Sequence, residues 1–436
     1  MYFLLFIIIS VFLFGLSRAI FNKIVNPCSV YITIWCVVLT LYKMNLIYYD
    51  RLINKTNIII IVYEISIVFG IIFGSKIKHK NNRLENYKND NKIDCRLLNR
   101  YIYITSFLAA IAIVPNTLLT ISKYGFIGMF TNISKIYRDR LIGEEFRIGY
   151  FSPMIFICLI LVAIRIKKDG LKKYDLIVVI LAALNAVTFG GRNNMVYTII
   201  FILTPLLVDV KIKAGLELEE IKSLNKNRKR IYRSIILLLV VGVPVFYIIN
   251  MQRALATVIP KNISPILQTL VAKNYSIYRT LLYITVPVAY MNNYLKNSYF
   301  MFGVNTFNFL YKELNHLGFN IPRMETLPFY NVPMSSNVGT YITELTIDFS
   351  VFGPLVIFLL GAIFGYYYSV YRRNNMNIWA AIIMSTGYVT VILSFFMWQI
   401  RSTTICLVII YGFIISVFFN RKLKIEYMKK MEKDKE

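Results

Sequence analysis

Long apolar runs separated by short basic stretches are the feature that most constrains what this chain can fold into. A helix needs about 18 or more apolar residues to cross a bilayer, and roughly eleven runs reach or approach that length. Of the 436 residues, 57% are apolar and 16% are charged, and the charges gather between the runs. A single soluble core, a coiled coil and a disordered chain are excluded. We expect an all-α polytopic integral membrane protein with about eleven transmembrane helices (range roughly 10–13). The expected spans are 2–20, 30–49, 57–75, 98–121, 150–166, 174–191, 193–210, 234–251, 349–371, 377–398 and 402–420.

The distribution of Lys and Arg predicts the orientation of these spans. Basic residues crowd the linkers 76–100 and 211–233 and the tail 421–436. Cytoplasmic loops of membrane proteins carry such an excess. Placing them all on the cytoplasmic side puts the N-terminus outside and the C-terminus inside. The net charge of +27 then reflects membrane topology, and we expect no nucleic acid partner.

This orientation divides the chain into four parts. Residues 1–251 form an N-terminal bundle of about eight spans, residues 349–420 form the C-terminal spans, and residues 421–436 form a basic cytoplasmic tail. Between them, 252–348 is one large outer-face segment, too long for a simple connection. Its aromatic content argues against disorder. We expect short helices there, with Leu281–Met291 the best candidate for a half-inserted one.

Arginines on the outer face are candidate ligands for an anion, because a guanidinium grips phosphate with two parallel hydrogen bonds and keeps its charge. Arg192 is the most suggestive, since it follows Gly190-Gly191 in a tight turn between two spans. The alternative is an arginine that reaches lipid phosphates and pins a helix end. The number of outer arginines favours a ligand. They are Arg138, Arg140, Arg147, Arg192, Arg253, Arg279, Arg323 and Arg401.

Two carboxylates and one histidine are candidate proton acceptors. Glu344 and Asp348 are four residues apart, so they share one face of a helix. They could accept a hydroxyl proton, or simply stabilise the start of a helix through its dipole. His316 lies in the large outer segment and could titrate near neutral pH, although a lone histidine is often structural.

Two charges are expected inside the membrane. Glu64 interrupts the third span, and Lys43 lies near the outer end of the second at a similar expected depth. Buried intramembrane charges are paired or functional. We expect an ion pair between Lys43 and Glu64, and a proton-coupling site is the alternative.

Several catalytic motifs are missing from the sequence. It has no DxD pair, no GxxxxGK[ST] loop, no HExxH and no CxxC. We therefore expect no metal and no cofactor. Any chemistry should use an activated substrate delivered through the membrane.

The layout and two local patches resemble the Wzy-type polymerases, which join oligosaccharide repeat units of bacterial O-antigen or capsule. One patch is Thr188-Phe189-Gly190-Gly191-Arg192-Asn193-Asn194, similar to the family's small-residue turn around an arginine. The other runs from Asn337-Val338-Gly339-Thr340-Tyr341 to Asp348-Phe349-Ser350-Val351-Phe352-Gly353, where Ser350 stands in place of a usual glycine. Arg138 with Gly149 also fits a spacing found in some members.

The resemblance implies an enzyme of the bacterial inner (plasma) membrane that transfers a glycan from undecaprenyl pyrophosphate to the terminal sugar of a new lipid-linked repeat. It implies that Arg192, Arg253, Arg401 and Arg138 bind pyrophosphate, and that Glu344, Asp348 or His316 takes the acceptor proton. A chain-length regulator and a flippase are the implied protein partners.

Two related functions stay open. A flippase or exporter of the same lipid-linked oligosaccharide would also need many spans and basic residues, but we would expect charge along several helices. An O-antigen ligase would use the same donor, and His316 would then matter more for its activity.

Overall fold

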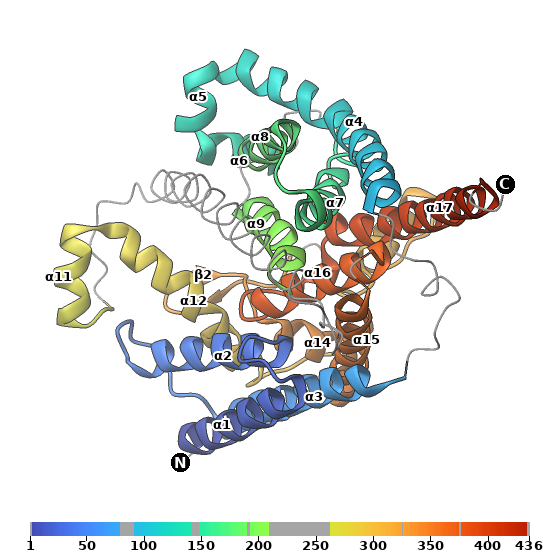
Figure 1. The fold of residues 1–436 in the computed structure, drawn as a ribbon. Coiled ribbons are helices and arrows are strands. Elements are labelled where there is room, and N and C mark those ends of the chain that lie inside the picture. Colours follow the sequence, from blue (N-terminus) through green and yellow to red (C-terminus); the bar gives the residue numbers. More distant parts are fainter. Residues whose placement is uncertain are drawn as a thin grey trace. The chain divides into compact units, whose positions relative to one another are not determined.

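The computed structural model describes residues 2–78, 91–141, 148–189, 192–208, 262–324, 326–374 and 376–433. Over these residues the chain is mostly helical (Figure 1). The sheet found in the described part is a two-stranded antiparallel hairpin, β1 (Tyr330–Asn331) and β2 (Ser335–Ser336). The chain forms two compact units, each built from separate stretches of sequence.

Unit 1 comprises Met1–Ile77, Ala254–Tyr367 and Gly387–Cys406, and unit 2 comprises Lys78–Arg253, Tyr368–Thr386 and Leu407–Glu436. Each unit is assembled by contacts between stretches far apart in sequence, which is a different division from the predicted membrane-spanning and outer-face parts with boundaries at 251, 348 and 420. The elements of unit 1 are α1 (Tyr2–Phe21), α2 (Pro27–Lys43), α3 (Asn54–Lys76), α11 (Pro265–Lys273), α12 (Tyr275–Tyr294), α13 (Asn308–His316), the hairpin, α14 (Tyr341–Phe349), η2 (Ser350–Phe352) and η3 (Gln399–Arg401).

Unit 2 contains α4 (Asn91–Tyr124), α5 (Phe126–Thr131), α6 (Ile133–Leu141), α7 (Met154–Asp169), α8 (Lys173–Thr188) and α9 (Arg192–Leu207). Three further helices contribute residues to both units: α15 (Gly353–Arg373), α16 (Ile378–Ile392) and α17 (Thr403–Lys433).

Five of the described helical stretches are long and apolar enough to cross a membrane, which makes this a mostly helical membrane protein. They are Tyr2–Phe21, Asn54–Lys76, Ile93–Tyr124, Tyr341–Arg373 and Thr403–Glu432; Pro27–Lys43, Asn193–Leu207 and Ile378–Ile392 are shorter apolar helices. Helices lie at ten of the eleven predicted spans, and the eleventh, 234–251, falls outside the described residues. The predicted tail largely continues α17 as far as Lys433.

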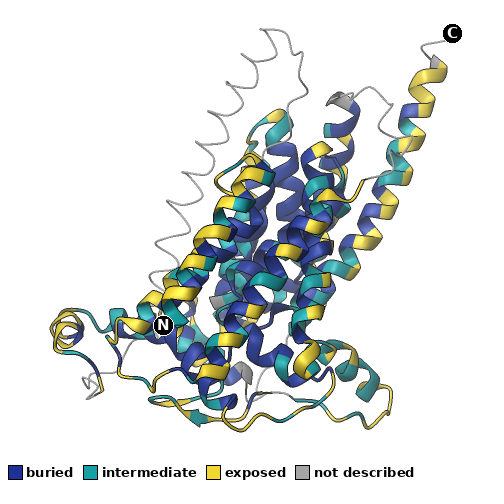
Figure 2. Cartoon of the chain, turned by 90° about the horizontal axis from the view of Figure 1, so that it is seen from below, coloured by how far each residue is buried: buried dark blue, intermediate teal, exposed yellow. Residues whose placement is uncertain are grey.

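Unit 2 is built around α7. Every residue from Met154 to Ile166 is buried, and α4, α8 and α9 all pack against this helix. A helix that is apolar on all sides is stable inside the protein. By contrast, much of α17 near the C-terminus is exposed, as Figure 2 shows.

Local signals in the sequence explain where several helices begin and end. Asn26 caps α2 by accepting a hydrogen bond from the Ser29 amide at 3.0 Å, and Pro27 follows as the first helical residue. Gly170 ends α7 with a φ of 80°. Ser350, with a φ of 49°, breaks the apolar stretch between α14 and α15, so that α14 is a separate short helix.

Glycines bring α3 and α15 into direct backbone contact within unit 1 (Figure 1). Gly70 and Gly74 lie four residues apart on α3, as do Gly361 and Gly365 on α15. A Cβ atom on Gly74 would lie 1.8 Å from the carbonyl oxygen of Ala362. One on Gly365 would lie 2.0 Å from a backbone oxygen of α3. Small residues at this spacing let membrane helices pack closely.

We expect Gly74→Leu to destabilise the protein strongly, because a side chain there must push two backbones apart. Overpacking costs about 1–3 kcal/mol, and a clash with backbone is at the upper end. Thermal unfolding in detergent measures the effect. Gly15→Leu on α1 is the matched control, since nothing lies within 4 Å of a Cβ at that position. Equal melting temperatures for the two variants would contradict the proposed packing constraint.

Candidate functional site

The structure joins two residues that the sequence predicted separately as a proton acceptor and a pyrophosphate ligand. Glu344 lies on α14, and Arg401 ends η3, 57 positions later. The Nη1 atom of Arg401 donates to Oε1 of Glu344 at 3.2 Å. Glu344 is 1% exposed, and the Arg401 side chain is 11% exposed. The two side chains form a nearly buried ion pair in unit 1.

The pair retains unused hydrogen-bonding capacity. Arg401 also donates to the Met324 carbonyl at 3.4 Å. The second carboxylate oxygen of Glu344, Oε2, is buried and has no hydrogen-bond partner among the described residues, although the Trp398 backbone lies near the carboxylate. A buried acceptor without a partner is costly. A ligand that donates to Oε2 would therefore gain a strong hydrogen bond.

Aromatic packing fixes α14 and thereby the position of Glu344. The ring of Tyr341 packs against Tyr31, Trp35, Tyr63 and Trp398, with centroid distances between 5.7 and 6.4 Å. The hydroxyls of Tyr31 and Tyr341 lie 2.7 Å apart. These contacts tie the first turn of α14 to α2 and α3. The Tyr341 amide also donates to the Ser394 carbonyl just after α16, at 3.0 Å.

Asp348 has a different role from the one the sequence suggested. Its carboxylate accepts four hydrogen bonds, from the backbone amides and side chains of Asn305 and Thr306, at 2.6–2.9 Å. Trp398 donates in turn to the Thr306 hydroxyl at 3.0 Å. A carboxylate with this many partners stabilises a loop and is a poor acceptor for a substrate proton. Asp348 therefore anchors the loop before α13 to the end of α14.

His316 lies apart from this pair. It is the last residue of α13 and is exposed. In the described residues it makes no hydrogen bond or ion pair with Glu344, Asp348 or Arg401. The structure therefore gives His316 no geometric support as the base.

Two other arginines predicted to bind pyrophosphate, Arg138 and Arg192, lie in unit 2. Arg138 is exposed on α6, and Arg192 begins α9. The side chain of Arg192 and the whole of Arg253 lie outside the described residues. Next to Arg138, Asp139 accepts a hydrogen bond from the Tyr124 hydroxyl at 2.6 Å, and Lys123 lies 3.3 Å away. These partners hold the pKa of Asp139 below its usual value.

The expected pair of Lys43 and Glu64 is not formed, and this prediction is corrected. Lys43 is exposed at the last position of α2. Glu64 is buried in the middle of α3, about 15 Å along that helix from its start, and accepts a hydrogen bond from the Ser10 hydroxyl at 2.8 Å. The prediction placed Lys43 and Glu64 at equal depths by counting residues from span boundaries that carry errors of several residues. The structure instead gives Oε1 of Glu64 a partner from α1, and Oε2 is buried without a hydrogen-bond partner among the described residues.

A small aromatic cleft in unit 1 was not found from the sequence. Its volume is about 180 Å³, and α12, the segment after β1 and the segment after α16 contribute to it. The rings of Tyr283 and Phe396 stack with centroids 4.9 Å apart, and Arg279 lies 5.9 Å from the ring centroid of Tyr275. Tyr275, Arg279, Tyr283 and Val286 recur at helical spacing and so lie on one face of α12. This spacing is the feature of the sequence from which the cleft could have been predicted. Phe396 lies far from these residues in the sequence and packs against them only in the folded chain.

The cleft lies close to the ion pair along the chain. Val338 lines the cleft six residues before Glu344, and Phe396 lines it five residues before Arg401. These connections are at most about 22 Å even if fully extended. The cleft offers ring faces, tyrosine and serine hydroxyls and one guanidinium. This combination suits a sugar ring.

The described residues contain no group of three or more His, Cys, Asp or Glu side chains that could hold a metal ion. Comparisons with protein-family models, curated proteins and solved structures find no match to this chain.

We expect Asp348→Ala to lower stability by about 2 kcal/mol or more, because it leaves two amides without their charged acceptor. The measurement is the thermal unfolding midpoint in detergent. Asp50→Ala provides the control, since that carboxylate is 78% exposed and has a lysine partner at the surface. A loss no larger than that of the control would show that Asp348 does not anchor the loop.

Proposed function

We propose that this protein polymerises undecaprenyl-pyrophosphate-linked oligosaccharide repeat units into a surface polysaccharide, O-antigen or capsule, by glycosyl transfer at the outer face of a bacterial inner (plasma) membrane. About eleven helices would cross the membrane, with the N-terminus outside and the C-terminus inside. The observation that carries the proposal is the buried pair of Glu344 and Arg401, each within six residues along the chain of a residue that lines the aromatic cleft. The sequence resemblance to Wzy-type polymerases adds to it.

The position of the pair agrees with the proposed orientation. Glu344 precedes α15, and Arg401 lies between α16 and α17. Two successive crossings, by α15 and α16, would bring the chain back to the side on which α15 begins, so the end of α16 and the start of α17 would lie on that side too. By the distribution of basic residues, that side is the outer one.

The chemistry assigns one role to each member of the pair. The acceptor hydroxyl oxygen attacks the anomeric carbon of the donor glycan, and Glu344 takes the hydroxyl proton. The bond between that carbon and the pyrophosphate oxygen breaks, and undecaprenyl pyrophosphate leaves with the electron pair. Arg401 stabilises the charge that develops on the phosphate oxygens. Binding of the diphosphate to Arg401 would free Glu344 to act as a base.

The aromatic cleft would hold a sugar of the acceptor or donor. At about 180 Å³ it is smaller than the roughly 300–1,000 Å³ typical of complete ligand pockets, so it fits one ring of a longer glycan. None of its lining residues belongs to the five long candidate spans. This place favours a sugar over the isoprenoid tail, which belongs in the bilayer.

We expect Glu344→Gln to abolish long polysaccharide while the protein still folds, because the amide keeps the shape of the side chain but cannot take a proton. A general base contributes about 10²–10⁴-fold to the rate. Cells lacking the gene, complemented with each variant, are compared by sizing gels of lipid-linked glycan. Lys296→Gln, which removes an exposed ion pair with Asp50 in the same unit, should retain wild-type chains.

Arg401→Ala should also abolish long chains, but it leaves Glu344 buried without its partner, at a cost of about 3–5 kcal/mol. The double variant Glu344→Gln with Arg401→Met removes both charges and separates misfolding from loss of chemistry. A stable double variant that makes long chains would overturn the proposal.

The same gels distinguish the related functions. Outward-facing single repeats without long chains support the polymerase. Single repeats retained on the cytoplasmic side identify a flippase, and long chains stranded on the lipid carrier identify a ligase.

We expect Arg192→Ala to accumulate single repeats as well, because an arginine in a glycine turn at the outer face would contribute to pyrophosphate binding. Loss of one such donor lowers the rate by about 10²–10³-fold. Arg421→Ala, in the basic tail, is the matched control. If Arg192→Ala makes chains of wild-type length, Arg192 does not bind the pyrophosphate. This result would not affect the roles proposed for Glu344 and Arg401.

A further inference from the structure

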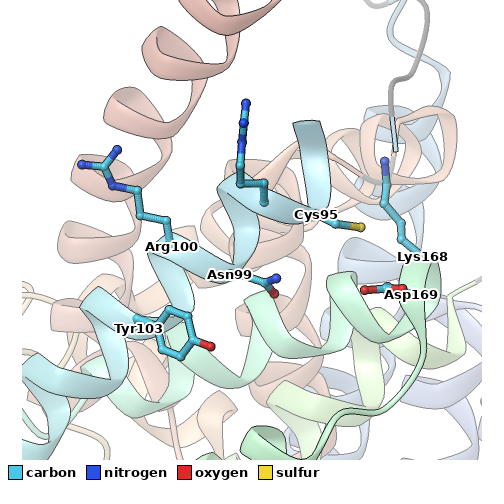
Figure 3. A pocket seen from close by; sticks show the side chains of 7 residues that line it. Cys95, Asn99, Arg100, Tyr103, Lys168 and Asp169 are labelled. Carbon is cyan, nitrogen blue, oxygen red and sulfur yellow. The ribbon is translucent and has the colours of Figure 1, made fainter. Parts of the chain in front are cut away.

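A second pocket lies entirely within unit 2, between the start of α4 and the end of α7. Its volume is about 630 Å³, within the range of ligand pockets. Figure 3 shows Arg100 and Tyr103 on α4 and Lys168 and Asp169 on α7. Cys95, Arg96 and Asn99 complete the lining.

Positive charge exceeds negative charge in this pocket. Three cations line it, against the single carboxylate of Asp169. Arg96 donates one hydrogen bond to Glu426 at 2.8 Å, and Lys168 is paired with Asp94. Arg100 is exposed and has no hydrogen bond or ion pair within the described part of the chain. An anion entering the pocket would therefore meet Arg100 and the remaining donors of Arg96.

The same face of α4 changes from charged to apolar along its length. Arg96 and Arg100 are followed, at steps of three or four residues, by exposed side chains that lie on one stripe of the helix. These are Tyr103, Phe107, Ile111, Val114 and Leu118. From Tyr103 to Val114 the stripe runs about 16 Å, close to half the roughly 30 Å hydrocarbon core. Its apolar part thus spans about one leaflet.

Tyr103 lies where the charged part of this face of α4 meets its apolar part. Tyr103 is 55% exposed, and its ring lies 5.5 Å from that of Tyr174 between centroids. Tyrosines are enriched at the level of lipid headgroups. On α7, the buried apolar run likewise ends at Ile164, immediately before Arg165, Lys167 and Lys168. Both helices place the pocket at the membrane surface.

We propose that this pocket binds the headgroup of an anionic phospholipid, with the phosphate on Arg96 and Arg100 and an acyl chain along the Tyr103–Val114 stripe. Free phosphate would use the guanidinium groups but leave the apolar stripe without a role. A zwitterionic lipid would use the stripe but gain less from an excess of positive charge. The site is independent of the proposed glycosyl transfer.

The test titrates delipidated full-length protein in detergent with phosphatidylglycerol and, separately, with phosphatidylcholine, and counts bound lipids by native mass spectrometry. The first phosphatidylglycerol should bind about tenfold more tightly than phosphatidylcholine, because both phosphates can accept from the arginines but the choline cation is repelled by the excess of positive charge. Arg100→Gln should remove this preference. Lys135→Gln removes an exposed cation on α6, a helix that contributes no residue to the pocket lining, and should keep the preference.

Two further arms separate the sources of phosphate. Excess inorganic phosphate should not displace the lipid, whereas Phe107→Ser should weaken lipid binding. Complete displacement by phosphate would identify a simple anion site and overturn the proposal. Equal affinity for the two lipids, or an unchanged preference in Arg100→Gln, would also overturn it.

Discussion

The close approach of α3 and α15 through four glycines is the constraint on which unit 1 depends. Two membrane helices in lipid gain little from apolar burial alone, because lipid is as apolar as their side chains. Contact between backbones provides van der Waals packing that bulky residues would prevent. A Cβ on Gly353 would lie 1.9 Å from the Tyr63 hydroxyl oxygen, so the start of α15 is fixed against α3 as well. The orientation of α14, immediately before it, follows from this fixed start.

The candidate site depends on α14 being held at both ends. Tyr341 packs among aromatic rings at the first turn, and Asp348 binds the 305–306 loop at the last. Glu344 lies between these anchors and meets Arg401 from another segment. A buried ion pair usually gains little stability, because both charges lose their hydration. Its presence between two strong anchors is better explained by a function for the charges than by stability.

Local patterns in the sequence were sufficient to locate the long helices, because the length and apolar content of a helix are properties of one continuous segment. They were not sufficient for α5 and α6, which are short, and α6 carries several charges. The i, i+4 spacing placed Glu344 and Asp348 on one helix, but not their separate partners. Those partners, Arg401 and the 305–306 loop, lie 57 and about 43 positions away and become neighbours only through tertiary packing. The pairing of Lys43 with Glu64 failed for a related reason. Each residue of error in a helix boundary moves a side chain by about 1.5 Å in depth.

The aromatic packing around Tyr341 has an optical consequence. The chain has three tryptophans, and two of them, Trp35 and Trp398, lie with ring centroids 5.9 and 6.4 Å from Tyr341. Both are almost fully buried, so water does not quench them. Trp398 also donates to the Thr306 hydroxyl, which is bonded to Asp348. Two of the three tryptophans therefore pack against Tyr341 on α14, and movement of α14 would change their emission without any added label.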